Sequence, residues 1–191
     1  VSALRPNHSS GPAFPLVNAG ALHAATRAVE SGVFDALADG PRSAAHLARD
    51  LGADERGLDR LLAFLEAGGY VTRRGRRYEN TRATTRWLTD AAGTNLGDYL
   101  LAWERVIGPY WAASLGTAVD GDRTVYEWVA DDPEATLTLQ RGFLAAARLA
   151  ADDVVRSVIL PDGATRLLDV GCGHGLYGAR FCRTYPGLEA V

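Results

Sequence analysis

Three glycines at alternate positions follow an acidic residue near the end of this 191-residue sequence, and together they could form a ligand-binding turn. Residues 167–175 have the sequence LLDVGCGHG, in which Asp169 lies two positions before the first glycine. Because glycine has no side chain, its backbone can turn sharply and approach a ligand closely. An apolar strand before the turn and a helix after it predict the strand–turn–helix unit in which such glycines bind cofactors.

The spacing of this turn favours a cationic ligand over a dinucleotide. A dinucleotide-binding turn has the pattern GxGxxG, and here leucine occupies position 176, where the third glycine would fall. A carboxylate at Asp169 would repel a pyrophosphate, whereas S-adenosylmethionine carries an ammonium and a sulfonium group. We therefore expect Asp169, Gly171, Gly173 and Gly175 to contact S-adenosylmethionine. The alternative is a turn that needs glycine for its geometry alone.

Two other residues of the turn are not assigned a catalytic role. We expect His174 to lie beside the cofactor without acting as a base, since a single histidine next to a ligand is more often a bystander. The sequence places no general base that would activate Cys172. Cys172 and Cys182 belong to neither a CxxC motif nor a histidine-rich cluster, so we predict no metal site and no disulfide framework.

The composition indicates a globular protein without the basic excess of a dedicated nucleic-acid binder. Apolar residues make up 47% of the chain and charged residues 23%, and the net charge is −3. No apolar run is long enough to span a bilayer, and the first residues lack a signal-peptide core, so we expect a soluble, cytoplasmic protein with no membrane partner. The chain begins without Met and stops at Val191 within an apolar segment, so we expect it to be part of a longer protein.

The first half of the sequence predicts four helices and a β-hairpin, which form a domain separate from the glycine turn. Apolar residues recur at helical spacing, Gly32 separates two helices, and Ser43 and Asp54 are helix N-caps. The segment around Gly75 predicts the hairpin, and a helix-turn-helix followed by such a hairpin is a winged-helix unit. The expected boundaries are 1–15 for an irregular lead-in, 16–31, 33–39, 44–51 and 55–67 for the helices, and 70–80 for the hairpin.

The second half predicts long helices and then the first strand–helix–strand unit of a parallel sheet. A helical run begins near Thr94 and restarts after Pro109, and a longer helix begins at Asp132 and Pro133 and continues to about Ile159. The unit that contains the glycine turn follows, and it is typical of α/β domains. Its expected parts are a strand over 166–170, a helix over 175–184 and a second strand near 188, and the expected domains are 16–92, 93–163 and 164–191.

The order of these parts resembles that of the S-adenosylmethionine-dependent small-molecule O-methyltransferases of the caffeate and actinobacterial polyketide-tailoring type. The resemblance covers nearly the whole chain from about Leu16, and its N-terminal pattern is specific to this family, whereas DxGxGxG marks the wider methyltransferase class. The matching segments are GVFDALADGPRSAAHLARDLGADERGLDRLLAFLEAGGYV, the tryptophan-containing helix around LLAWERV, and LLDVGCGHG followed by YPGLEAV.

The resemblance implies a fold and a partner. The fold would be a mainly α-helical winged-helix dimerisation domain with linker helices, followed by the truncated start of a class I Rossmann-like α/β methyltransferase domain. In the family the N-terminal half interlocks with a second subunit and does not bind DNA, so a homodimer is expected. The linker helices cover the acceptor pocket, and the cofactor contacts carry over to Asp169, Gly171, Gly173 and Gly175.

The resemblance also implies where a small aromatic acceptor would bind. Phe143 matches a pocket phenylalanine, and Ala147 occupies a position where relatives often have methionine. Trp103, Tyr110 and Trp111 are further candidates for enclosing the acceptor, because apolar pockets with a few polar groups hold flat ligands. For each of these aromatic residues, ordinary packing between helices is the alternative.

No catalytic residue is assigned within the chain. The family's ribose-binding acid lies at the end of the second strand, about three residues beyond Val191, and its catalytic histidine base and supporting acid come later still. Glu189 is not given the ribose role, since it lies early in its strand.

Two other functions remain open. The full protein could keep this fold and cofactor and catalyse a hydroxylation, a decarboxylation or a pericyclic step, as some relatives do. A winged-helix DNA-binding regulator is the other alternative, because arginines in and after the hairpin could contact phosphates. Acidic residues around the would-be recognition helix oppose it. The arginines are Arg73, Arg74, Arg76, Arg77, Arg82 and Arg86, and the acids are Asp50, Asp54, Glu55 and Asp59.

Overall fold

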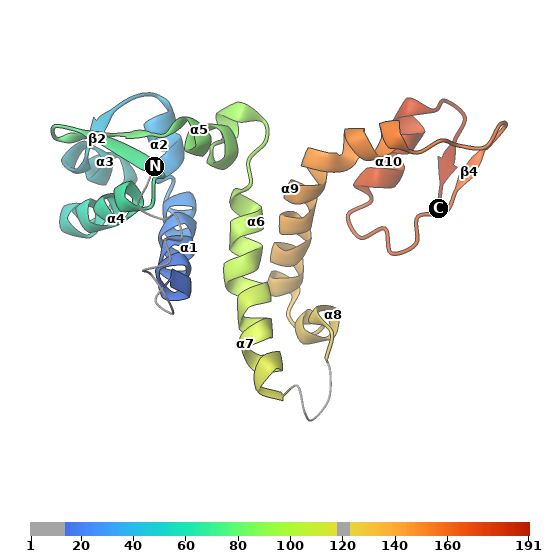
Figure 1. The fold of residues 1–191 in the computed structure, drawn as a ribbon, viewed down its shortest axis with the longest axis horizontal. Coiled ribbons are helices and arrows are strands. Elements are labelled where there is room, and N and C mark those ends of the chain that lie inside the picture. The colour runs from blue at the N-terminus through green and yellow to red at the C-terminus, as the bar shows by residue number, and fades with distance from the viewer. Residues whose placement is uncertain (1–13, 118–122) are drawn as a thin grey trace. The chain divides into compact units, whose positions relative to one another are not determined.

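The computed structural model describes residues 14–117 and 123–191. The chain divides into two compact units, of which the first extends to Leu100 and the second begins at Leu101 (Figure 1). The first helix begins at Phe14, two residues earlier than predicted. Residues 1–13 of the predicted irregular lead-in lie outside the described residues.

Capped helices form most of the first unit. The hydroxyl of Ser43 accepts a hydrogen bond from the backbone N–H of His46, and the carboxylate of Asp54 accepts one from Gly57, so both predicted N-caps are confirmed. Gly32 adopts a left-handed φ of 71° and separates the first two helices as expected. The helices are α1 (Phe14–Glu30), α2 (Val33–Ala38), α3 (Ala44–Leu51), α4 (Glu55–Ala67) and α5 (Arg82–Leu88).

The predicted hairpin is part of a three-stranded antiparallel sheet. Strands β2 (Val71–Arg74) and β3 (Arg77–Asn80) pair on either side of a tight turn in which Gly75 has a φ of 63°. A third strand, β1 (Arg42–Ser43), pairs with the other edge of β3. The sequence did not predict β1, because two residues are too few to show the alternation of a strand.

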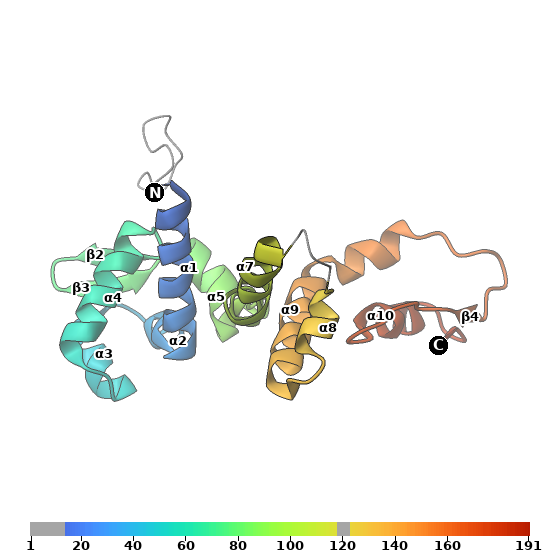
Figure 2. The same cartoon turned by 90° about the horizontal axis from the view of Figure 1, so that it is seen from below.

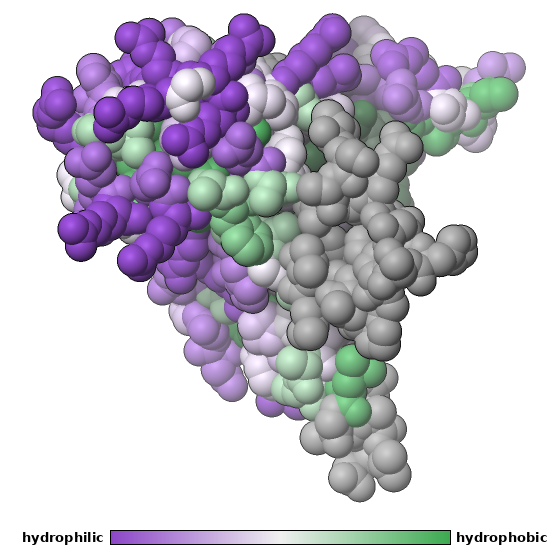
Figure 3. Space-filling model, turned by 60° about the vertical axis from the view of Figure 1, so that its left-hand side comes forward, coloured by the Kyte–Doolittle hydropathy of each residue, from purple (hydrophilic) through white to green (hydrophobic). Residues whose placement is uncertain are grey.

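One apolar cluster holds the first unit together. Phe34, Leu47, Leu62 and Tyr78 are almost fully buried and pack in this cluster. The Tyr78 hydroxyl donates a hydrogen bond of 3.2 Å to Asp59, and burial, together with the nearby Asp59 carboxylate, raises the pKa of Tyr78. On the face that Figure 3 shows, hydrophilic side chains cover most of the described surface.

A continuous helical run leads into the second unit and contains an unpredicted π-helical turn. Helix α6 (Gly97–Ala102) is followed by the π-helical segment Trp103–Ile107 and by α7 (Gly108–Thr117). The N–H of Gly108 bonds to the carbonyl of Trp103, five residues back, so α7 begins before Pro109 and not after it as predicted. Pro109 then lies in the first turn of α7.

Two capped helices complete the helical part of the second unit. Thr124 is the N-cap of helix α8 (Val125–Val129). Asp132 is the N-cap of α9 (Pro133–Ser157), and its carboxylate accepts hydrogen bonds from two first-turn N–H groups. The long helix was predicted correctly at its start and ends two residues before the predicted Ile159. A cluster of Val106, Ile107, Val129 and Leu139 packs α9 against the π-helical segment and α8.

The end of the chain forms the predicted strand–turn–helix–strand unit, but its first strand ends at Leu167 and not at Val170 as predicted. Strands β4 (Arg166–Leu167) and β5 (Glu189–Ala190) are parallel, and α10 (Leu176–Thr184) lies alongside them (Figure 2). Ladder bonds continue past the strand ends, since the N–H of Asp169 donates to the carbonyl of Val191 at 2.8 Å. None of the described helices is both long and apolar enough to cross a membrane.

The packing of α9 predicts different costs for two neighbouring leucines. Leu139 is 1% exposed in the cluster, whereas Leu137 is 50% exposed on the same helix. We expect Leu139→Ala to lower the free energy of unfolding by about 2–5 kcal/mol, because it leaves a cavity. Leu137→Ala should change it by less than about 1 kcal/mol. Urea unfolding followed by circular dichroism measures both, and equal effects of the two substitutions would refute the packing described for α9.

Candidate functional site

The glycine turn has a backbone that requires glycine at each alternate position. Gly171, Gly173 and Gly175 have φ angles of 74°, 49° and 67°, in the left-handed region that other residues rarely adopt. The N–H of Gly175 donates to the carbonyl of Cys172 at 2.8 Å and closes the turn. The turn therefore presents a chain of backbone groups without side chains between the end of β4 and the start of α10.

Asp169 lies where the parallel ladder ends, close to α10. Its carboxylate oxygen Oδ2 lies 3.2 Å from the point where a Cβ on Gly178 would be, and the Cβ of Ala190 lies equally near that point. Gly178 thus lets α10 pack closely on the strand pair and beside this carboxylate. The sequence analysis missed Gly178, although a glycine inside a predicted helix signals close packing.

His174 caps the helix that follows the turn. Its ring atom Nδ1 accepts a hydrogen bond of 3.2 Å from the backbone N–H of Leu176, where the N-cap residue Gly175 offers no side chain. An Nδ1 that accepts this bond places the proton of the neutral ring on Nε2. His174 therefore has a structural role in the turn and also presents an N–H donor from its other ring nitrogen.

A hollow of about 860 Å³ lies over the turn within the second unit. One wall comes from α8 and α9, and the other comes from the turn and the first residues of α10. The residues that line it are Tyr126, Gln140, Phe143, Ala146, Ala147, Asp169, Gly171, Cys172, Gly173, His174 and Tyr177.

The structure brings together only part of the predicted site. Five of the nine residues predicted to bind the cofactor or the acceptor line the hollow, and Gly175 instead occupies the N-cap position of α10. The other three candidates are not among the lining residues. Those in the hollow are Asp169, Gly171, Gly173, Phe143 and Ala147, and those outside it are Trp103, Tyr110 and Trp111.

The three aromatic residues outside the hollow pack against other helical residues. The ring of Trp103 meets the ring of Trp111 edge-on with centroids 4.9 Å apart. The Tyr110 hydroxyl donates a hydrogen bond of 2.6 Å to the carbonyl of Arg123, and its ring lies near Trp128. Aromatic content alone could not predict the direction of these side chains, because helix rotation decides it.

The start of α8 is fixed by a reciprocal cap that positions Tyr126. The Thr124 hydroxyl accepts from the N–H of Glu127, and the Glu127 carboxylate accepts from the N–H and the hydroxyl of Thr124 at 2.7 and 2.9 Å. These hydrogen bonds, first the backbone one and then the side-chain one, lower the pKa of Glu127.

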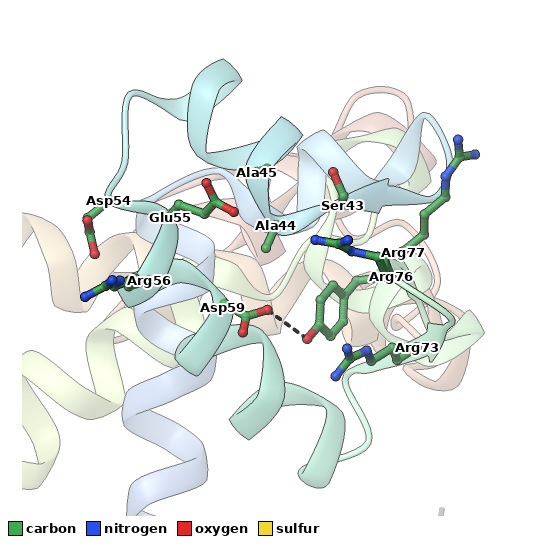
Figure 4. A pocket seen from close by; sticks show the side chains of 11 residues that line it. Ser43, Ala44, Ala45, Asp54, Glu55, Arg56, Asp59, Arg73, Arg76 and Arg77 are labelled. Atoms are coloured by element: carbon green, nitrogen blue, oxygen red, sulfur yellow. Dashed lines mark hydrogen bonds between the residues drawn. The ribbon is translucent and has the colours of Figure 1, made fainter.

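A second hollow lies in the first unit, where the sequence left DNA binding open. It has a volume of about 770 Å³ between the start of α4 and the hairpin (Figure 4). Arg73 lies over the ring of Tyr78, and Arg74 pairs with Glu79 outside the hollow. Carboxylates share the hollow with the arginines, so it is not a uniformly basic surface. The charged residues that line it are Asp54, Glu55, Asp59, Arg56, Arg73, Arg76 and Arg77.

The described residues contain neither a cluster of metal ligands nor a disulfide. Within residues 14–117 and 123–191, no three His, Cys, Asp or Glu side chains are grouped to hold a metal ion. Cys172 and Cys182 are both free thiols.

Comparisons with known proteins identify relatives of both units. Residues 21–90 match the O-methyltransferase dimerisation domain. The chain is 31% identical to 3-hydroxy-5-methyl-1-naphthoate 3-O-methyltransferase of Streptomyces sahachiroi, over 87% of this chain and 49% of that protein. It is 27% identical to the N,N-dimethyltransferase OxyT of Streptomyces rimosus, over 90% of this chain and 51% of that protein.

Solved structures show the same fold. The crystal structure of human N-acetylserotonin methyltransferase in complex with S-adenosylmethionine matches with a TM-score of 0.77 and 21% identity. The match covers 97% of this chain and 60% of that one.

The curated relatives that this chain matches are methyltransferases, and the solved methyltransferase structure has the same fold. Within that class, residues 21–90 are a dimerisation domain of the O-methyltransferases, which confirms the family resemblance found in the sequence. The chain spans about half the length of the curated relatives that it matches.

The cap of α8 predicts that this helix becomes less stable at low pH. Because the pKa of Glu127 is lowered in the folded chain, its contribution to stability is present above the unfolded value, near 4.5, and is lost as the pH falls through the folded value. We expect carbon-13 NMR to give a Glu127 titration midpoint below 4.5, and amide protection in α8 to fall across it. A midpoint at or above 4.5 would argue against the cap.

The contact between His174 and Leu176 predicts one tautomer. At mildly alkaline pH, nitrogen-15 NMR of the neutral ring should show the proton on Nε2 and a bare Nδ1. The opposite tautomer would exclude His174 as the cap of α10.

Proposed function

We propose that the protein containing this chain is an S-adenosylmethionine-dependent O-methyltransferase that acts, as a homodimer, on a small aromatic or polyketide-type natural product. The observation that carries the proposal is the glycine turn, with Asp169 at the end of a parallel strand, opening into a hollow that α9 covers with Phe143 and Ala147. The hollow has the volume usual for small-molecule sites.

The donor set of this hollow fits the cofactor. The backbone of the turn admits close approach, and the Asp169 carboxylate offers oxygen acceptors to an ammonium group. The ring of Phe143 and the methyl group of Ala147 supply an apolar wall above the turn. Because no carboxylate other than Asp169 lines the hollow among the described residues, the site would hold a cation without crowding it with negative charge.

The residues of this chain would act by binding and alignment. When bound, S-adenosylmethionine supplies a methyl group on a positively charged sulfur, which an acceptor oxygen can attack in line. Asp169 and the turn would hold the cofactor, while Phe143 and the methyl group of Ala147 would hold a flat acceptor against it. No residue of the chain is assigned as the base that removes the acceptor proton.

The first unit supports the proposal of a homodimer. Residues 21–90 match a dimerisation domain, and we assign α1–α4 with the β2–β3 hairpin to a winged-helix unit that serves this purpose. Residues 164–191 would be the start of a class I Rossmann-like domain. DNA binding has less support, because carboxylates at the start of α4 share the hairpin hollow with the arginines.

The test of the proposal is binding and methyl transfer by the protein. Calorimetry should detect S-adenosylmethionine binding, and Asp169→Asn should weaken it at least about tenfold, equal to about 1.4 kcal/mol, because the ammonium loses its counter-charge. Asp162→Asn is the matched control, since Asp162 lies exposed before β4, and it should bind as the unsubstituted protein does.

The transfer reaction separates the remaining functions. A hydroxynaphthoate is a suitable acceptor, given the relative that acts on 3-hydroxy-5-methyl-1-naphthoate. Mass spectrometry should show one added methyl group on oxygen. Binding of the cofactor without transfer to any hydroxyl acceptor would favour a non-methylating reaction on the same fold, and absence of binding would refute the proposal altogether.

A further inference from the structure

Gln140 is a polar side chain in the hollow to which the sequence analysis gave no role. It lies on α9, half-buried, and its atom Oε1 is 3.4 Å from the point where a Cβ on Gly173 would be. The carboxamide therefore lies directly against the glycine turn. It makes no hydrogen bond to any residue within the described ranges.

The long helix α9 fixes Gln140 at this place. Phe143 and Ala147 lie three and seven positions further along, on the same helical face, and also line the hollow. The neighbouring Leu139 is buried against the π-helical segment and α8, which sets the rotation of the helix about its axis. The packing of Leu139 thus places residue 140 on the wall of the hollow.

The charges around the hollow leave one end of the cofactor without a partner. The amino-acid end of S-adenosylmethionine carries an ammonium group and a carboxylate. Asp169 can accept from the ammonium but would repel the carboxylate. No arginine or lysine lines the hollow among the residues that the structure describes, so neutral donors are the groups that these residues offer to the carboxylate.

A carboxamide is suited to this task because it carries two N–H donors beside its oxygen. With Oε1 of Gln140 facing the turn, the Nε2 atom is free to donate. His174, which also lines the hollow, carries a further donor in its Nε2–H group.

We propose that Gln140 binds the carboxylate at the amino-acid end of S-adenosylmethionine through its side-chain N–H groups. Asp169 then holds the ammonium, and the two contacts together orient the sulfonium methyl toward the acceptor. This inference rests on the proposed function, since it assigns a residue to the same cofactor.

Three ligands and three variants of the protein test the assignment. S-adenosylmethionine and S-adenosylhomocysteine both have the amino-acid end, whereas 5′-methylthioadenosine lacks it. Gln140→Leu should weaken the first two about tenfold and change the third less than twofold. Gln140→Glu should weaken the first two at least as much, because a second carboxylate repels that of the ligand. Arg141→Leu, at the exposed neighbouring position, is the control and should change none of them.

The outcomes separate the inference from the function on which it rests. If the unsubstituted protein binds neither S-adenosylmethionine nor S-adenosylhomocysteine, the proposed function itself fails. If it binds both and Gln140→Leu leaves their affinity unchanged, or weakens 5′-methylthioadenosine equally, the assignment of Gln140 is overturned. Retained affinity in Gln140→Glu would also overturn it. Circular dichroism of each variant confirms that the helices are intact.

Discussion

The hydrogen bond from the backbone N–H of Asp169 to the carbonyl of Val191 fixes the main chain of the residue whose carboxylate the candidate site depends on. It extends the β4–β5 ladder to the point where the glycine turn begins, so the backbone of Asp169 cannot move away from the turn without breaking this hydrogen bond. Gly178 then allows α10 to approach within contact of the same carboxylate. A backbone that already has its binding conformation loses less conformational freedom when a ligand binds, which is the advantage of a preformed site.

The helices of the second unit serve this arrangement from the opposite side. Helix α9 packs near its start on Val106 and Ile107. Near its end, Val155 packs on Phe181 and Leu188, so one helix connects the helical cluster with the unit that contains the glycine turn. The reciprocal cap at Thr124 and Glu127 starts α8 at a defined residue and places Tyr126 at the rim. The hollow is therefore built from regular elements, with the turn as its irregular part.

The sequence predicted the helix caps and tight turns correctly, because these features depend on residues that are neighbours in the chain. Ser43 and Asp54 cap their helices as expected, and the hairpin turns at Gly75, because caps and tight turns follow from a few adjacent side chains. The same holds for the strand, turn and helix around Gly171. Strand β1 and the π-helical turn escaped prediction, since the first exists only through pairing with β3 and the second has no periodic signature.

The composition of the hollow could be predicted only in part for a related reason. Asp169 and the glycines form a contiguous motif, whereas Gln140 and Tyr126 reach the hollow through the packing of α9 and α8. Trp103 and Trp111 are as aromatic as Phe143, yet they face each other elsewhere. The measurement that tests the central claim most directly is an amide NMR titration with S-adenosylhomocysteine. The shifts should concentrate on Gly171, Gly173 and the first turn of α10. Shifts confined to the β2–β3 hairpin, or no shifts in the turn, would contradict it.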